Sequence, residues 1–288
     1  LDVFKQGGWS TFGVDPAENL YEISKTKDHE LLCDFWNYET SKKFKDKNLD
    51  VIVAQNVFAH LDDVHDFLEA CKNVMTDKTL LFIQTSQKNM FSEYEFDTIY
   101  HEHVSFFSIK SMKTVLEQHN LFLNDIHFPS IHGTSYLFAI SFNNISSKSV
   151  EIKLDEEEKQ GRYDTNLYYK YNNICNQIKD KINLRVKEYI DAGKKVIGVG
   201  AAAKGNTFLN FCGTKLSYIV DENPKKQNLY TPGTNIIIKP LEYLTKEKDN
   251  VAIFILAWNF AEELTRKIKN IRPNNNDDIF SVKSIQLE

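Results

Sequence analysis

Residues 50–56 read DVIVAQN and residues 79–84 read TLLFIQ, and these two apolar runs decide the fold class. Each run is continuous, and the first ends in polar Gln55 and Asn56, as expected of a strand covered on both faces. The intervening residues 61–75 have the apolar spacing of a helix. A strand, a helix and a second strand in this order predict a right-handed crossover within a doubly wound parallel α/β sheet.

The neighbouring segments extend this pattern in both directions. Before the first run, residues 10–14 predict a short strand and residues 18–27 predict a helix. After the second run, helical spacing and then the spacing of a closing antiparallel pair are found at residues 109–119, 121–128 and 134–142. We therefore expect a Rossmann-like domain in the first half of the chain.

A polar and charged stretch at residues 143–160 separates this half from a second α/β series. A long amphipathic helix is expected from Tyr163 to Ala192, and Gly193 ends it. Further strands are expected at residues 195–199, 216–220 and 251–257, with a helix near residues 207–211. The predicted domains are residues 1–145, a linker with the long helix at residues 146–192, and residues 193–288.

The composition is that of a globular protein with two domains. Its 288 residues are 42% hydrophobic and 26% charged, which argues against disorder and coiled coil. A net charge of -5 disfavours nucleic acid as a partner. No run approaches the roughly 18 apolar residues of a membrane span, and the four cysteines form no CxxC pair, so no membrane segment, disulfide framework or zinc ribbon is expected. We expect a cytoplasmic protein that is truncated before Leu1, because its first residues already belong to an α/β unit.

Polar residues follow the predicted strands of the first half, where open α/β sheets bind their ligands. Asp15 could accept hydrogen bonds from the two hydroxyls of a ribose, or it could cap the turn at Pro16. Asn56, followed by the ring of Phe58, could hold an adenine or a substrate, or begin a helix that continues into the core. Gln84 ends the third predicted strand.

The densest group of chemically useful side chains is FDTIYHEHVSFFS at residues 96–108. Its titratable groups follow the third strand amid aromatic residues, where burial is costly unless the groups are used. A histidine in such surroundings can serve as a general base. Two alternatives stay open: a polar surface loop, and a metal site formed by His101 and His103, which lacks a third ligand at a defined spacing.

The loop from Gly198 to Gly205 follows a predicted strand and opens a helix. With Asp221 about 20 residues further on, it resembles a dinucleotide fingerprint, so an NAD-dependent dehydrogenase is one interpretation. In a second interpretation, the amides of the helix start and Lys204 bind a substrate phosphate. In a third, the loop is a tight turn without a ligand.

Segments in a fixed order carry a family resemblance: VDPAEN at residues 14–19, QNVFAHLDD at 55–63, FDTIYHEHVSFFS at 96–108, IHGTSYLF at 131–138, VIGVGAAAKGNTFLNFCG at 196–213, YIVDENPKKQNLYTPGTNIIIKP at 218–240 and ILAWNFAEE at 255–263. The combination resembles the sugar C-methyltransferases. These enzymes use S-adenosylmethionine to methylate a carbon next to the ketone of a nucleotide-linked 4-keto-deoxysugar. The resemblance identifies a truncated Rossmann-like methyltransferase domain, followed by a Rossmann-like carboxy-terminal domain that binds substrate.

The resemblance implies a role for each member of the histidine cluster. His103 removes the proton from the carbon beside the ketone, and Tyr100 and Glu102 orient the sugar or handle protons. The enolate carbon then displaces the methyl group from the sulfonium in line, a step that requires no metal.

The resemblance also implies the ligands. S-adenosylmethionine is the expected cofactor, and its binding residues are Asp15, Asn56, Phe58 and Gln84. The expected partner of this monomer or weak oligomer is a nucleotide-diphosphate sugar, such as a dTDP-linked one, bound by His101, His132, Gly133, Lys204 and Asn206.

The family pattern includes parts that this chain does not show. They are an amino-terminal zinc-binding module and a first strand with a glycine-rich loop, both expected before Leu1, and an acid where this chain has Gln84. Two other functions stay open: a degenerate nucleotide-sugar-binding protein without methyl transfer, and the NAD-dependent dehydrogenase.

Overall fold

The computed structural model describes residues 1–288 except 87, 131–133, 146, 287 and 288, and it divides into two compact units. The first unit comprises Leu1–Ser86, Val104–Pro129 and Ser135–Lys159. The second unit comprises Gln87–His103, Ser130–Thr134 and Gln160–Glu288.

A four-stranded sheet lies at the centre of the first unit, in the order β3 (Val51–Gln55), β4 (Leu80–Thr85), β6 (Tyr136–Ser141) and β5 (Phe122–His127). β3 and β4 are parallel and connected through α4 (Val64–Val74), which confirms the predicted order of strand, helix and strand. β6 is antiparallel to both β4 and β5, so the predicted closing pair is confirmed as well.

One face of this sheet packs against α4 and α5 (Ile109–Gln118), where Leu68, Leu81 and Met112 are fully buried. The other face is more open, because Val53 of β3 is 44% exposed and Leu80 of β4 is 41% exposed. The predicted burial of residues 50–54 on both faces is therefore wrong. β3 is the edge strand of this sheet, and fewer side chains cover it than cover a central strand.

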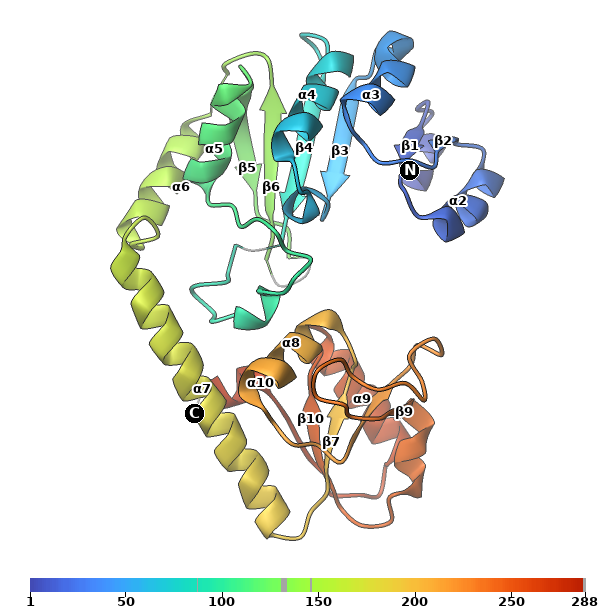
Figure 1. The fold of residues 1–288 in the computed structure, drawn as a ribbon, viewed down its shortest axis with the longest axis vertical. Helices are drawn as coiled ribbons and strands as arrows, with labels where there is room; N and C mark the ends of the chain where they lie inside the picture. The colour runs from blue at the N-terminus through green and yellow to red at the C-terminus, as the bar shows by residue number, and fades with distance from the viewer. Residues whose placement is uncertain (87, 131–133, 146, 287–288) are drawn as a thin grey trace. The chain divides into compact units, whose positions relative to one another are not determined.

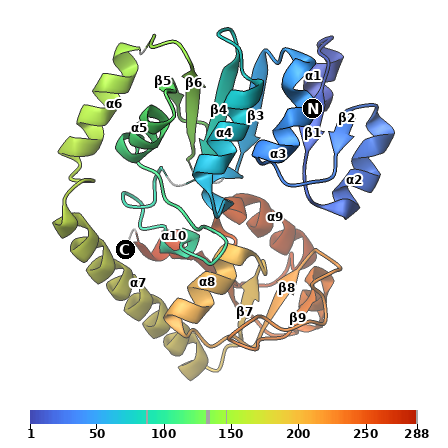
Figure 2. The same ribbon diagram turned by 45° about the horizontal axis from the view of Figure 1, so that its top comes forward.

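A separate parallel pair, β1 (Phe12–Val14) and β2 (Glu30–Leu32), precedes the four-stranded sheet, together with α1 (Asp2–Gln6), α2 (Glu18–Ser24) and α3 (Tyr38–Ser41). Figures 1 and 2 show this pair beyond β3, on the side away from β4. A groove of about 790 Å³ lies between the β1–β2 pair and the four-stranded sheet, and side chains of both β1 and β3 line it. The sequence predicts one continuous sheet here, whereas the structure has two, because β1 and β3 do not pair with each other.

The polar stretch before the second unit contains α6 (Lys148–Lys159), which packs on the first unit. Its Glu157 is buried, and the carboxylate accepts hydrogen bonds from the Tyr136 hydroxyl at 2.5 Å and from the Ile109 amide at 2.9 Å. Glu157 therefore connects α6 to β6 and caps the amino terminus of α5.

A five-stranded parallel sheet forms the second unit, in the order β11 (Asp278–Ser281), β10 (Ala252–Ile255), β7 (Val196–Val199), β8 (Tyr218–Asp221) and β9 (Ile238–Pro240). One face packs against α7 (Thr165–Asp191), α8 (Ala203–Cys212) and α10 (Val282–Gln286), and the other against α9 (Ala261–Ile271). Helices on both faces of a parallel sheet confirm the Rossmann-like architecture predicted for this half.

Short 3-10 helices complete the chain: η1 (Lys25–Lys27), η2 (Lys42–Lys47), η3 (Phe58–His60), η4 (Phe96–Thr98), η5 (Leu241–Lys246) and η6 (Trp258–Phe260). The four cysteines are free thiols, and Cys71, Cys175 and Cys212 are buried. None of the helices in the described ranges is both long and apolar enough to cross a membrane.

The segment that contains η4 belongs to the second unit. The ring of Phe96 packs against two rings of α8, with centroid separations of 5.7 Å to Phe208 and 5.0 Å to Phe211. The sequence places this segment in the domain of residues 1–145. The structure differs because the aromatic contacts attach the histidine cluster to the carboxy-terminal sheet.

Candidate active site

The candidate active site centres on His103, at the end of the segment that η4 begins. Its side chain is buried, and Nδ1 lies 2.7 Å from the backbone carbonyl oxygen of Thr98. A carbonyl oxygen can only accept a hydrogen bond, so Nδ1 must carry the proton. In a neutral imidazole this leaves the lone pair on Nε2, which is the form that a general base requires.

Tyr100 faces the basic nitrogen. Its hydroxyl lies 3.2 Å from Nε2 of His103, and the two ring centroids are 4.2 Å apart. Burial is the main cause that raises the pKa of Tyr100, and the charge of Glu102 adds to it. Tyr100 is therefore a protonated phenol at neutral pH, able to donate a hydrogen bond to Nε2 or to an oxygen of a ligand.

The other two members of the cluster lie on its exposed side. The side chain of His101 is 90% exposed and that of Glu102 is 60% exposed, with His101 Nε2 at 3.9 Å from Glu102 Oε1. His103 is buried whereas His101 is exposed, so the two imidazoles are not arranged to bind one metal ion together. Across the described ranges, no group of three or more His, Cys, Asp or Glu residues is arranged to hold a metal.

The loop between β7 and α8 has a shape that packing explains. Gly200 has φ at +92°, and a Cβ there would lie 2.7 Å from Cβ of Ala257. A Cβ on Gly205 would lie 2.9 Å from Cβ of Leu256. These glycines permit α8 to approach the end of β10 closely, as a tight strand-to-helix turn requires.

Asp221, the acid of the apparent dinucleotide fingerprint, closes the same loop. Its Oδ2 accepts a hydrogen bond from the Ala201 amide at 2.7 Å, and its Oδ1 accepts one from the Asn223 amide at 2.8 Å. A dinucleotide site needs this carboxylate for a ribose hydroxyl. The geometry therefore favours a structural turn over the dehydrogenase interpretation.

Lys204 and Asn206 turn inward at the start of α8. Nζ of Lys204 is buried 4.6 Å from the ring centroid of Trp258, and Oδ1 of Asn206 is buried without a hydrogen-bond partner in the described part of the chain. The predicted binding of a substrate phosphate needs an ammonium group that reaches the ligand. In this conformation the ammonium has no hydrogen-bond partner among the described residues, and its positive charge lowers the pKa values of the buried acids Asp97 and Glu95 of the same unit.

The residues predicted to bind the cofactor lie at strand ends of the first unit, in different environments. Asp15 is exposed, and its Oδ1 accepts a hydrogen bond from the Ala17 amide at 2.8 Å, so it caps the turn before α2. Phe58 is completely buried and packs against Phe67 and Phe107, with centroid separations of 5.5 Å and 4.9 Å. The structure gives Phe58 a core role.

Asn56 and Gln84 end two adjacent strands. Asn56 has φ at +53°, and its amide donates to the carbonyl oxygen of Gln84 at 3.2 Å. The Gln84 side chain is buried and donates to the Ser135 hydroxyl at 3.1 Å, which connects β4 to the start of β6. Two buried oxygens nearby, Oδ1 of Asn56 and Oγ1 of Thr85, have no hydrogen-bond partner within the described residues. Buried polar atoms without partners are rare in folded proteins, and these two fit a polar ligand at the carboxyl ends of β3 and β4.

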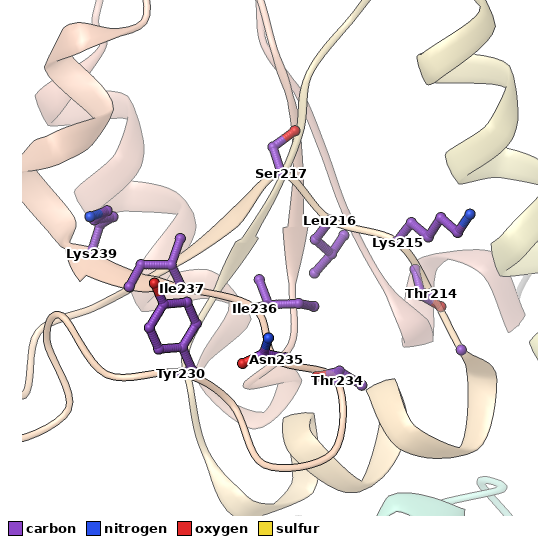
Figure 3. Close-up of a pocket in the computed structure, with 11 residues that line it drawn as sticks. Thr214, Lys215, Leu216, Ser217, Tyr230, Thr234, Asn235, Ile236, Ile237 and Lys239 are labelled. Carbon is purple, nitrogen blue, oxygen red and sulfur yellow. The ribbon is translucent and has the colours of Figure 1, made fainter.

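Two predicted substrate residues cannot be placed, and a cavity of the second unit lies away from the described site residues. His132 and Gly133 lie outside the described residues. A cavity of about 730 Å³ lies at the amino-terminal ends of β8 and β9 (Figure 3). Lys215 and Lys239 lie at its two sides, and none of the predicted site residues that the structure describes lines it.

Sequence reasoning missed two features of the histidine site. The Thr98 carbonyl that fixes the imidazole is a backbone atom, and no side-chain motif announces it. Trp258 Nε1 donates to Asp97 Oδ2 at 2.6 Å across 161 positions of the chain. The available signal was a tryptophan shortly after the buried strand β10, where a polar ring nitrogen needs an acceptor.

Comparison with known proteins finds a matching domain family for each half of the chain. The family of C-methyltransferase C-terminal domains matches residues 130–282, and a methyltransferase domain family matches residues 1–124. C-methyltransferase NovU of Streptomyces niveus is 28% identical over 284 residues, which cover 95% of this chain and 67% of NovU.

Solved structures are similar to part of the chain. A SAM dependent methyltransferase from Archaeoglobus fulgidus is 14% identical with a TM-score of 0.40, over 49% of this chain and 79% of that one. The PH0226 protein from Pyrococcus horikoshii OT3 is 12% identical with a TM-score of 0.35, over 48% and 74%. The C-terminal domain match covers more than half of the chain by itself, and the expected resemblance is confirmed. The chain belongs to the C-methyltransferases that use S-adenosylmethionine as methyl donor.

Proposed function

We propose that this C-methyltransferase acts on a nucleotide-linked keto-deoxysugar, and that His103 is its general base. The observation that carries the proposal is the 2.7 Å hydrogen bond from His103 Nδ1 to the Thr98 carbonyl. It leaves Nε2 as the unprotonated nitrogen of a buried imidazole. A hydrogen on a carbon next to a ketone is acidic enough for such a base.

The residues of this chain divide the chemistry between them. Nε2 of His103 takes the proton, and the electron pair of the broken C–H bond forms the enolate, whose negative charge lies mainly on oxygen. The Tyr100 hydroxyl, 3.2 Å from Nε2, donates a hydrogen bond to that oxygen. Glu102, on the exposed side of the cluster, orients the sugar through its hydroxyls. S-adenosylmethionine, when bound, supplies an electrophilic methyl group on a sulfonium.

The first unit supplies the cofactor residues in this proposal. Asn56 Oδ1 and Thr85 Oγ1, the buried oxygens without partners, would accept hydrogen bonds from the adenine or the amino group. Oδ2 of Asp15 would accept one from a ribose hydroxyl while Oδ1 keeps the Ala17 amide.

The test uses a substitution that separates the two nitrogens of the imidazole. In His103→Asn, the side-chain amide can still donate to the Thr98 carbonyl, but no base remains. We expect methyl transfer to a nucleotide-linked 4-keto-deoxysugar to slow by roughly 100-fold or more. Calorimetric binding of S-adenosylmethionine should stay within a factor of about two. Normal turnover of this variant would assign proton removal to another group.

A further inference from the structure

Trp258 is bound to the histidine cluster by one short hydrogen bond. Its Nε1 donates to Oδ2 of Asp97 at 2.6 Å, and both residues belong to the second unit. Asp97 is 4% exposed, and its second oxygen, Oδ1, has no hydrogen-bond partner among the described residues. Trp258 is therefore the hydrogen-bond partner that holds this buried carboxylate.

Asp97 lies in η4, one residue before the carbonyl that fixes the base. Thr98 is itself fully buried, and its carbonyl oxygen accepts from His103 Nδ1. A turn of three residues is too short to move Asp97 without moving Thr98 as well. The orientation of the imidazole thus depends on the same hydrogen bond that holds Asp97.

Two lysines fix the indole from which this hydrogen bond originates. Nζ of Lys204 and Nζ of Lys283 each lie 4.6 Å from a ring centroid of Trp258. Lys283 also bonds to Glu93 and lies 3.4 Å from Glu95 Oε1, next to the same turn. Burial raises the pKa of Asp97, and the charges of Lys204 and Lys283 oppose that rise. Charge and cation–π contacts therefore support one arrangement of the Asp97–Trp258 pair.

We propose that Trp258 and Asp97 are positioning residues that hold the Thr98 carbonyl, and through it His103, in the orientation for proton removal. The inference rests on the proposed function of His103. It gives the carboxy-terminal sheet a task beyond substrate binding, because Trp258 lies in the loop after β10 and Lys204 lies in the first turn of α8, after β7. A misplacement of the base by about 1 Å can cost roughly 100-fold in rate.

Trp258→Phe is the decisive variant, because it keeps an aromatic ring near Lys204 and Lys283 and removes the indole N–H. We expect kcat to fall by about 10- to 100-fold, with KM for the sugar within about twofold. The pKa that governs the basic form of His103 in the pH profile of kcat/KM should also shift, since the Nδ1 partner is no longer fixed. Trp9→Phe, at a ring that is 46% exposed in the first unit, is the matched control and should leave kcat within about twofold.

Asp97 supplies the conservative rescue. Asp97→Asn keeps an acceptor for the indole N–H and should recover most of the kcat that Asp97→Ala loses. If Trp258→Phe and Asp97→Ala act through one hydrogen bond, the double variant should be no slower than the slower single variant. These comparisons remain informative if Trp258→Phe unfolds, because the two Asp97 variants are tested with Trp258 intact.

The outcomes separate this inference from the proposed function. His103→Asn is measured in the same assay. If His103→Asn is inactive while Trp258→Phe keeps the kcat and the pH profile of the unmodified enzyme, the positioning role is overturned and the base stands. Equal kcat losses in Asp97→Asn and Asp97→Ala would also overturn the positioning role. If His103→Asn is fully active, the proposed function itself fails.

Discussion

Removing the ammonium group of Lys204 should destabilise the second unit in a pH-dependent way. Its Nζ is buried, and its charge is the first among the neighbouring charges that lower the pKa values of Asp97 and Glu95. Burial nevertheless leaves both pKa values raised. Lys204→Met keeps the length of the side chain and its contact with Trp258, so the substitution mainly removes a charge.

The magnitude follows from what remains after the substitution. Glu95 keeps Lys283 at 3.4 Å, whereas Asp97 keeps the indole N–H of Trp258 and the smaller effect of the Lys283 charge. Asp97 thus loses the larger of the two positive charges that lower its pKa, although Lys204 makes no hydrogen bond to it. Breaking a buried, hydrogen-bonded ion pair completely costs about 3 to 5 kcal/mol, which sets an upper limit here. Because Lys283 still contributes, we expect Lys204→Met to lower the free energy of unfolding at pH 7 by about 2 to 3 kcal/mol, which is at or below the lower end of that range. This corresponds to roughly 5 to 10 °C in Tm for a chain of this size.

The sign of the pH dependence gives the sharper test. Both acids have raised pKa values in the folded state, so the folded protein holds their protons more tightly than the unfolded chain does. Stability therefore falls as pH rises from the unfolded pKa, near 4, through the folded pKa. The variant raises the folded pKa further, so its deficit should be largest at pH 7 and should shrink toward pH 4 to 5.

Urea denaturation at pH 7 and pH 5, followed by tryptophan fluorescence, measures the deficit. Lys215→Met, at an exposed lysine of the same unit, is the control and should change the free energy of unfolding by less than about 0.5 kcal/mol. A deficit of equal size at both pH values, or none at either, would refute the assignment of Lys204 as the counter-charge. Loss of nucleotide binding without any loss of stability would restore the phosphate-binding role predicted from the sequence.

Two further predictions concern buried acids that hold elements together. Arg272 and Asp277 are both buried and paired at 2.7 Å, so Arg272→Met should cost about 3 to 5 kcal/mol in urea denaturation, and a cost below about 1 kcal/mol would contradict the pairing. Glu157→Ala should lower the free energy of unfolding by about 2 to 4 kcal/mol, because the Tyr136 hydroxyl and the Ile109 amide both lose their acceptor. Glu157→Gln, which keeps one acceptor oxygen, should cost clearly less, and equal costs for the two variants would speak against the cap.

The sequence predicts the alternation of strands and helices well, because local residue patterns encode each of these elements. The continuous apolar runs of β7 and β10 and the helical spacing of α7 lie within a few residues of their predicted positions. The short elements escape such reasoning. β2 and β9 have three residues each, too few for a periodic signal, and their pairing depends on distant partners.

The candidate site is harder to predict, because its decisive contacts are not local. Titratable residues between aromatic rings single out residues 96–108 in the sequence, and the family resemblance implies the roles of His103 and Tyr100 within them. The indole N–H that holds Asp97 comes from a residue far along the chain, and it becomes visible only when β10 and η4 are placed. For the same reason, Lys204 resembles a phosphate ligand in the sequence, whereas in the structure its ammonium is buried over the ring of Trp258.

Solvent exchange tests the central claim, that His103 removes a proton from the carbon beside the ketone. The enzyme is incubated in deuterium oxide with a nucleotide-linked 4-keto-deoxysugar and S-adenosylhomocysteine, which has no methyl group to transfer. Proton removal then appears as deuterium at that carbon, independently of methyl transfer. The account predicts deuterium uptake by the unmodified enzyme and a rate at least roughly 100-fold lower in His103→Asn. Undiminished uptake in His103→Asn would contradict it.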